Sequence, residues 1–225
     1  AAFPKLVAPD GRIHTTFNQT GTATGRLSSR NPNLQNIPIR TKLGREIRHA
    51  FIAEDGYELV SFDYSQIELR IASMLSADEK LISAFRNKQD IHHRTAAEIF
   101  NVSKEKVTKE MRRRAKTVNF GILYGMGARA LAEGIGVSVA EAEAYLDEYA
   151  RDFPGVQAYR EKTIAAGRRK GYVETLFGRR RSLPNLRSSF DYVRKEAERM
   201  AINAPIQGTA ADLIKRAMVE ITKEL

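Results

Sequence analysis

The strongest constraint on the fold is one long helical pattern, which runs from about Ser103 to Tyr124 and stops at Gly125 and Gly127. Such a helix needs neighbours that bury its apolar side. Capping residues followed by apolar periodicity predict these neighbours. The predicted helix starts are Ser65 with Glu68, Ser76 with Glu79, Asp90 (a helix through Phe100) and Ser138 with Glu141.

The remaining pattern predicts an α+β chain that is predominantly helical. Loops and short strands are expected in the first 40 residues, which are rich in Thr, Asn, Gly and Pro. Further expected elements are a short strand from Tyr57 to Phe62, a helix that ends at Lys170 before Gly171, a hairpin over residues 172–183, and two last helices, 189–204 and 209–225, separated by Pro205.

Composition excludes several classes of protein. The 225 residues contain no cysteine, so disulfides, thiolate nucleophiles and Cys-ligated metals are excluded. A hydrophobic content of 42% is typical of a globular chain of one domain or two small ones. No apolar run approaches the ~18 residues of a membrane span, and the N-terminus lacks a signal-peptide pattern. We therefore expect an intracellular protein without a membrane partner and, since no initiator Met is present, a piece of a longer one.

The net charge of +10 is concentrated in two tracts. Residues 104–116 hold seven basic and two acidic side chains, and residues 160–187 hold nine basic and two acidic ones. The tracts therefore carry the whole excess, which favours binding to a phosphate backbone. Two solvated helix faces are the alternative.

The long helix carries a mixed stripe of Arg112, Lys116, Phe120 and Tyr124. Steps of four residues advance only about 40° around the axis, so the four side chains share one face. A core face would not hold two cations, and a solvated face would not end in two aromatic rings. Cations for a triphosphate, followed by rings for the sugar and base, suit the binding of a nucleotide. The alternative is that the four residues recur at this spacing by chance.

Asp63 lies where the predicted strand gives way to a helix, a position that suits a ligand of Mg²⁺. Its alternative role is to cap that helix together with Ser65. No pair among the four histidines has metal-ligand spacing. Two polar sets, one at Arg26, Asn33, Gln35 and Asn36 and one at Arg199, Asn203 and Gln207, have the residue types that reach phosphates and base edges, or are ordinary solvated surface.

Longer motifs now point to a family. Residues 63–70 (DYSQIELR) resemble motif A of the family A DNA polymerases, the bacterial DNA polymerase I group, and residues 112–125 resemble motif B, its nucleotide-binding fingers helix. Residues 22–27, 33–38 and 207–212 also match, so the resemblance covers nearly the whole chain in the family's order.

The resemblance implies a right-hand polymerase fold, of which this chain holds the fingers and part of the palm. Residues 1–75 would be partial palm, residues 76–190 the fingers, and residues 191–225 the return to palm helices. The family's thumb and its motif C, a His-Asp-Glu turn with the second catalytic Asp, are not in the sequence, where no His is followed by Asp.

The resemblance also implies roles for single residues. Asp63 would be the first catalytic carboxylate and, with the Tyr64 carbonyl, a ligand of two Mg²⁺ ions that activate the primer 3′-hydroxyl and stabilise pyrophosphate. Arg112 and Lys116 would hold the triphosphate during catalysis. The other implied nucleotide contacts are Gln66, Glu68 (crowding the sugar 2′-position), His92, Phe120 and Tyr124, and the implied primer–template contacts are Arg26, Asn33, Gln35, Asn36, Arg199, Asn203 and Gln207.

The implied function is template-directed DNA synthesis by a parent enzyme that adds dNTPs to a primer and is located in the bacterial cytoplasm, at the nucleoid. Because the second carboxylate is missing, the resemblance implies activity for the parent enzyme and leaves the activity of the isolated chain open. Two alternatives remain open: a non-catalytic module that binds DNA and dNTP, and one half of a split polymerase whose thumb and motif C act in cis or in trans.

Overall fold

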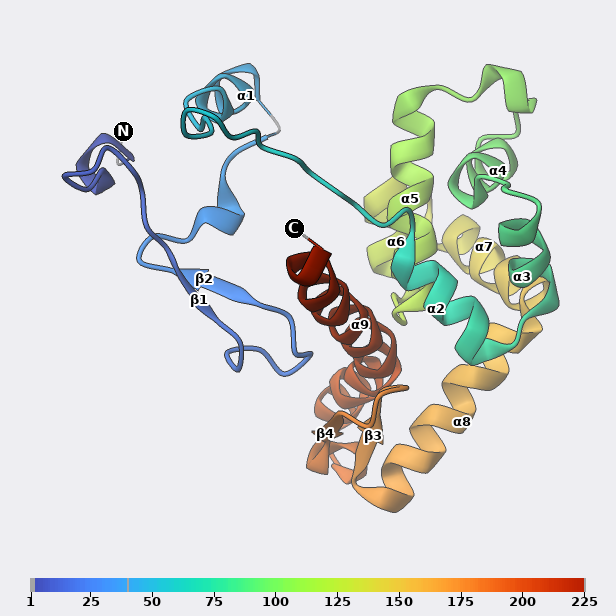
Figure 1. The fold of residues 1–225 in the computed structure, drawn as a ribbon. Helices are drawn as coiled ribbons and strands as arrows, with labels where there is room; N and C mark the ends of the chain where they lie inside the picture. Colours follow the sequence, from blue (N-terminus) through green and yellow to red (C-terminus); the bar gives the residue numbers. More distant parts are fainter. Residues whose placement is uncertain (1–2, 40, 225) are drawn as a thin grey trace. The chain divides into compact units, whose positions relative to one another are not determined.

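A computed structural model describes residues 3–39 and 41–224 and divides into two compact units (Figure 1). One unit contains the described residues up to Ser65 together with those from Lys215 onward, and the other is Gln66–Ile214. The mostly helical fold class is confirmed, with strands only in two short antiparallel pairs among the described residues. The division into palm and fingers at residues 75 and 190 stays a prediction.

The first unit consists of loops and short elements, as its composition predicts. Strand β1 (Thr16–Asn18) pairs antiparallel with β2 (Ser28–Arg30), and Thr16 lies opposite Arg30. Helix α1 begins after Thr41, whose hydroxyl accepts a hydrogen bond from the Gly44 backbone N–H. The other elements are 3-10 turns at Phe3–Leu6 and Leu34–Asn36, and α1 itself spans Lys42–Arg48.

The expected strand from Tyr57 to Phe62 is wrong. The segment has no regular secondary structure, and its apolar side chains are exposed, from 67% at Val60 to 84% at Phe62. β-prone residues form a strand only when a second strand completes the hydrogen-bond ladder. None of the described strands pairs with this segment.

The second unit is helical, and none of the described helices combines the length and hydrophobicity that a membrane crossing requires. Its elements are α2 (Ile67–Ser76), α3 (Glu79–Arg86), α4 (Ile91–Ile99), α5 (Lys109–Leu123), α6 (Ala128–Ile135), α7 (Val139–Asp152), α8 (Pro154–Lys170), the hairpin β3 (Tyr172–Glu174) and β4 (Arg180–Ser182), and α9 (Asp191–Glu224), which continues into the first unit.

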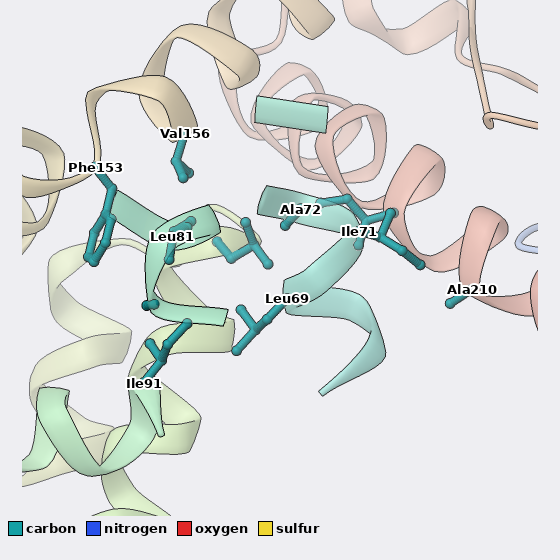
Figure 2. Close-up of a cluster of buried hydrophobic side chains, with 11 residues drawn as sticks. Leu69, Ile71, Ala72, Leu81, Ile91, Phe153, Val156 and Ala210 are labelled. Atoms are coloured by element: carbon teal, nitrogen blue, oxygen red, sulfur yellow. The ribbon is translucent and has the colours of Figure 1, made fainter. Parts of the chain in front are cut away.

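Three buried clusters hold these helices together. Figure 2 shows the largest, in which Leu69 of α2, Leu81 of α3 and Ile91 of α4 gather with buried side chains of α8 and α9. A second cluster joins α5, α6 and α7 around Val118, and a third packs the hairpin against α9. The apolar periodicity of each helix therefore finds a partner within the unit.

Some predicted helix ends are confirmed. Ser138 and Glu141 form the capping box of α7, and Asp90 caps α4 by accepting from the His93 N–H. Gly171, at φ 80°, ends α8 in the left-handed conformation that costs other residues free energy.

Other predicted starts are wrong by a few residues. Helix α2 begins after Gln66, which is left-handed and makes no side-chain cap, and Asp78 rather than Ser76 caps α3. The long helix begins after Thr108, five residues later than the pattern indicates, because a 3-10 turn precedes it. The sequence pattern does not predict helix α6.

The expected break at Pro205 is also wrong, because α9 runs through it as one helix. Proline removes one backbone donor and crowds the preceding turn, which normally bends or ends a helix. Here Pro205 is buried between Ala204 and Ile206, and the Tyr159 hydroxyl donates to the Ile202 carbonyl at 3.2 Å, near the disturbed turn. The turn that contains Pro205 is therefore buried and packed against neighbouring helices.

Asp78 ties two helices together. Its buried carboxylate accepts from the Leu81 N–H of α3 at 3.1 Å and from the Gly155 N–H at the start of α8 at 2.9 Å. A Cβ on Gly155 would lie 2.9 Å from the Asp78 Cα, so only glycine allows this approach.

We expect Asp78→Ala to lower the free energy of unfolding by about 2–3 kcal/mol, because two N-terminal caps are lost. Urea denaturation followed by circular dichroism measures the change. Asp147→Ala, at an exposed site on α7, is the control and should stay within about 0.5 kcal/mol. A loss at Asp78 no larger than in this control would contradict the double cap.

Candidate nucleotide site

Helix α5 presents the predicted stripe. Its buried face, which includes Ala115, Val118 and Ile122, packs toward α4 and α6. The stripe lies beside that face, with Arg112, Phe120 and Tyr124 partly buried and Lys116 exposed.

The cationic end of the stripe is anchored to α4. The Arg112 Nε donates to Asp90 Oδ2 at 2.6 Å, while the other Asp90 oxygen caps α4. Burial opposes ionisation of the Asp90 carboxyl, but the bonds from Arg112 and the His93 N–H outweigh it and hold the Asp90 pKa below its usual value. Lys116 forms no ion pair with any described residue, and its Nζ lies 6.0 Å from the Phe120 ring centre.

The aromatic end is also fixed. The ring centres of Phe120 and Tyr124 are 6.0 Å apart, and that of His92 is 5.7 Å from Phe120. The Tyr124 hydroxyl donates to the carboxylate of Glu68, which lies in the first turn of α2. Four of the predicted nucleotide contacts, Glu68, His92, Phe120 and Tyr124, therefore form one connected group with Arg112 and Lys116, drawn from three helices. Gln66, another predicted contact, lies at the start of α2, and its buried Oε1 has no partner among the described residues.

His92 is almost completely buried, at 1% exposure. Its Nδ1 accepts a hydrogen bond from Asn119 Nδ2 at 3.0 Å. Burial lowers the His92 pKa to about 4, and the positive charges of Arg112 and Lys116 add to the effect while Asp90 opposes it. The ring is therefore neutral at physiological pH. Sequence reasoning missed Asn119, although a polar residue on the apolar face of a helix is a usable signal.

The end of α5 adjoins one predicted DNA-contact set. Arg199, Asn203 and Gln207 follow one another at four-residue steps on α9. Gly125, which follows Tyr124 with φ 79°, has the Arg199 side chain 3.3 Å from the position of a Cβ. The Oδ1 of Asn203 is buried without a partner in the described part of the chain.

The other predicted DNA contacts lie in the first unit, and all are exposed: Arg26, Asn33, Gln35 and Asn36. Two of them also hold their own loop. The Asn33 side chain accepts from the Gln35 N–H at 3.0 Å, and Gln35 Nε2 donates to the Leu27 carbonyl at 3.2 Å.

Asp63 and Tyr64 also belong to the first unit and lie exposed in the segment without regular structure. Their carboxylate and carbonyl oxygens are the ligand types that Mg²⁺ prefers. However, no group of three or more His, Asp or Glu side chains that could hold a metal occurs among the described residues. The donor chemistry fits a hard cation, but the described residues do not complete its ligand set.

Many cations of the second basic tract have partners within the protein. Arg179 forms two hydrogen bonds to Asp212 of α9, at 3.0 and 2.6 Å, and Arg187 donates to the Arg168 and Arg169 carbonyls at the end of α8. Arg168 pairs with Glu198. The tract thus has structural roles beyond charge alone.

Comparison with known proteins identifies the family. The model of "DNA polymerase family A" matches residues 1–225. The chain belongs to DNA polymerase family A. It is 57% identical over 223 residues to "DNA polymerase I, thermostable" of Thermus aquaticus. The aligned region covers 99% of this chain and 27% of that protein. DNA polymerase I of Pseudomonas aeruginosa is 56% identical over 219 residues, covering 97% of this chain and 24% of its own length.

A solved structure agrees with the family assignment. The POL domain of Pol1 from M. smegmatis, in complex with DNA primer-template and dNTP, matches with a TM-score of 0.91 and 49% identity. The match covers 99% of this chain and 40% of that one. The chain thus spans about a quarter of the length of the curated family A polymerases it matches.

We expect the contribution of the Asp90–Arg112 pair to depend on pH. Asp90→Asn keeps a capping side chain and removes the charge. Because the folded pKa of Asp90 is lowered, its stabilising contribution is complete well above the ordinary value of 3.8 and is lost as the pH falls through the lowered one. The pair is partly exposed, so Asp90→Asn should cost at most about 1 kcal/mol at neutral pH.

Urea denaturation at a series of pH values measures this difference, which should shrink below pH 3.8. Asp147→Asn, at an exposed position, is the control and should show no such trend. A difference for Asp90→Asn that is the same at every pH would contradict the ion pair.

Proposed function

We propose that this chain is the nucleotide-binding part of a template-directed DNA polymerase, which adds deoxynucleotides to a primer 3′-hydroxyl and releases pyrophosphate. The observation that carries the proposal is the connected group on α2, α4 and α5, in which cations and aromatic rings share one face. Its support from outside the chain is the likeness to a Pol1 domain in complex with primer-template and dNTP.

Each side chain of the group has a role in this proposal. Arg112 and Lys116 neutralise the triphosphate, and the Phe120 ring packs on the sugar and base. Tyr124 occupies the template-base position until the nucleotide binds. Its hydrogen bond holds Glu68 where that carboxylate crowds a ribose 2′-hydroxyl, which favours dNTP over rNTP.

Asp63 and the Tyr64 carbonyl would supply part of a Mg²⁺ site. When bound, Mg²⁺ lowers the pKa of a hydroxyl and neutralises phosphate charge. Arg26, Asn33, Gln35, Asn36, Arg199, Asn203 and Gln207 would contact primer–template, where minor-groove acceptors are nearly the same for all correct base pairs.

A second candidate is a module that binds DNA and dNTP without catalysis. The observation that favours it is the lack of a three-carboxylate or mixed ligand group among the described residues. The third candidate is a split polymerase, in which a second polypeptide supplies the missing metal ligands.

Primer extension with Mg²⁺ and all four dNTPs tests these proposals. Extension by a polypeptide that joins this chain to a thumb and motif C, without extension by this chain alone, supports the leading proposal. Extension after simple mixing supports the split enzyme. Salt-sensitive binding without extension in either arrangement supports the binding module and contradicts the polymerase.

In the complete polymerase, Lys116→Ala should raise the apparent KM for dNTP about tenfold or more and lower the rate, because a charged triphosphate contact is lost. Steady-state kinetics measure both. Arg113→Ala is the matched control, since this exposed cation on the same helix already pairs with Glu110. If Lys116→Ala weakened only the affinity for DNA, Lys116 would be a backbone contact instead.

DNA binding by this chain should weaken with salt, with a log–log slope of about −0.9 for each phosphate contact. Arg199→Ala should make the slope shallower by about 0.9. Arg151→Ala, which removes an exposed cation outside both polar sets, should leave it unchanged. Fluorescence anisotropy of a labelled primer–template measures the slopes, and a flat salt response of the unmodified chain would exclude the DNA contacts.

A further inference from the structure

The buried imidazole of His92 has one satisfied nitrogen and one unsatisfied nitrogen. Nδ1 accepts from Asn119, whereas Nε2 has no hydrogen-bond partner among the described residues. A buried polar atom without a partner is costly and rare in folded proteins. This atom lies in the ring that packs beside Phe120, next to Arg112 and Lys116. The described residues therefore leave this nitrogen in need of a hydrogen-bond partner.

The partner of Nδ1 determines where the ring carries its proton. Asn119 is completely buried, and its Oδ1 accepts from the Thr95 hydroxyl at 3.1 Å. The carboxamide oxygen is thus engaged by Thr95, and the amide N–H groups face His92. A nitrogen that accepts from an amide N–H carries no proton, so the neutral ring must carry its proton on Nε2.

We propose that Asn119 and Thr95 are positioning residues that hold His92 in its Nε2–H tautomer, so that the neutral ring donates a hydrogen bond to a triphosphate oxygen of the dNTP. The inference rests on the proposed function of the α5 surface. It adds a specific requirement, which is that His92 acts as an uncharged donor whose proton is fixed before the nucleotide arrives.

A neutral donor suits this location. The charged groups that face His92 are Arg112 and Lys116 of α5 and Asp90 at the start of α4. If His92 were protonated, its buried ring would carry a third positive charge close to the charges of Arg112 and Lys116. A neutral N–H provides a directed bond to phosphate without that repulsion. Affinity for dNTP should therefore not follow a histidine titration between about pH 6 and pH 8.

The tautomer can be read directly by long-range ¹H–¹⁵N correlation spectra of this chain labelled with ¹⁵N-histidine. His92→Gln assigns the signals. We expect the Nε2–H pattern without ligand, and a selective shift of Nε2 when dATP is added. An Nδ1–H pattern in the unmodified chain would overturn the proposal.

Two substitutions separate positioning from simple packing. Thr95→Val keeps the shape and removes the hydroxyl donor, so the Asn119 amide can reverse. We expect a mixture of tautomers and about tenfold weaker dATP binding, the loss of one bond to a charged group. Thr95→Ser, which keeps the hydroxyl, should restore both. A pure Nε2–H spectrum and unchanged affinity in Thr95→Val would exclude the role of Thr95.

Asn119→Asp should reverse the ring, because a carboxylate accepts from a proton-bearing Nδ1. We expect an Nδ1–H signal and dATP binding that depends on pH between about 6 and 8. Circular dichroism checks that each variant folds, and Thr95→Val provides the test if the buried carboxylate of the Asn119→Asp variant is not tolerated. If dATP shifts no signal in the unmodified chain, the proposed function fails, whereas the spectrum without ligand still decides whether Asn119 sets the tautomer.

Discussion

The packing of α5 against α4, α6 and α7 positions the cations and rings of its stripe. Helix α5 must bury Ala115, Val118 and Ile122, and this requirement sets its rotation about its own axis. With that rotation fixed, side chains four residues apart face the surface as a row. The Asp90–Arg112 bond at one end and the Tyr124–Glu68 bond at the other then secure the row to α4 and α2. The arrangement of these surface side chains therefore depends on ordinary helix packing.

The site also shows how buried polar groups can be matched across neighbouring helices. Thr95, Asn119 and His92 form a short chain of hydrogen bonds in the buried part of the interface between α4 and α5. Such a network specifies one arrangement of the two helices, because any slip would leave several polar atoms unpaired. Its last atom, Nε2 of His92, has no partner in the described part of the chain. The same bonds that determine the packing thus leave one buried nitrogen unsatisfied, which is the atom on which the proposed contact to a nucleotide depends.

Local signals predicted much of the fold. The capping box at Ser138, the cap at Asp90 and the stop at Gly171 all depend on residues close in sequence. The wrong predictions concern segments whose secondary structure depends on contacts with residues far away in the sequence. The Tyr57–Phe62 segment has strand-forming residues but no paired strand among the described residues, and α9 continues through Pro205 because surrounding side chains bury and support that turn.

The candidate site also has a part that local sequence predicts and a part that depends on contacts between helices. Its stripe on α5 follows from spacing alone, and the comparisons confirm the family that its motif indicates. The bond between Asn119 and His92 joins residues on different helices, so no local pattern contains it.

Photolabelling of this chain with 8-azido-dATP tests the central claim that this surface binds a nucleotide. The account predicts label within residues 109–124 that unlabelled dATP displaces. Label spread over other peptides, or label that dATP does not displace, would contradict it.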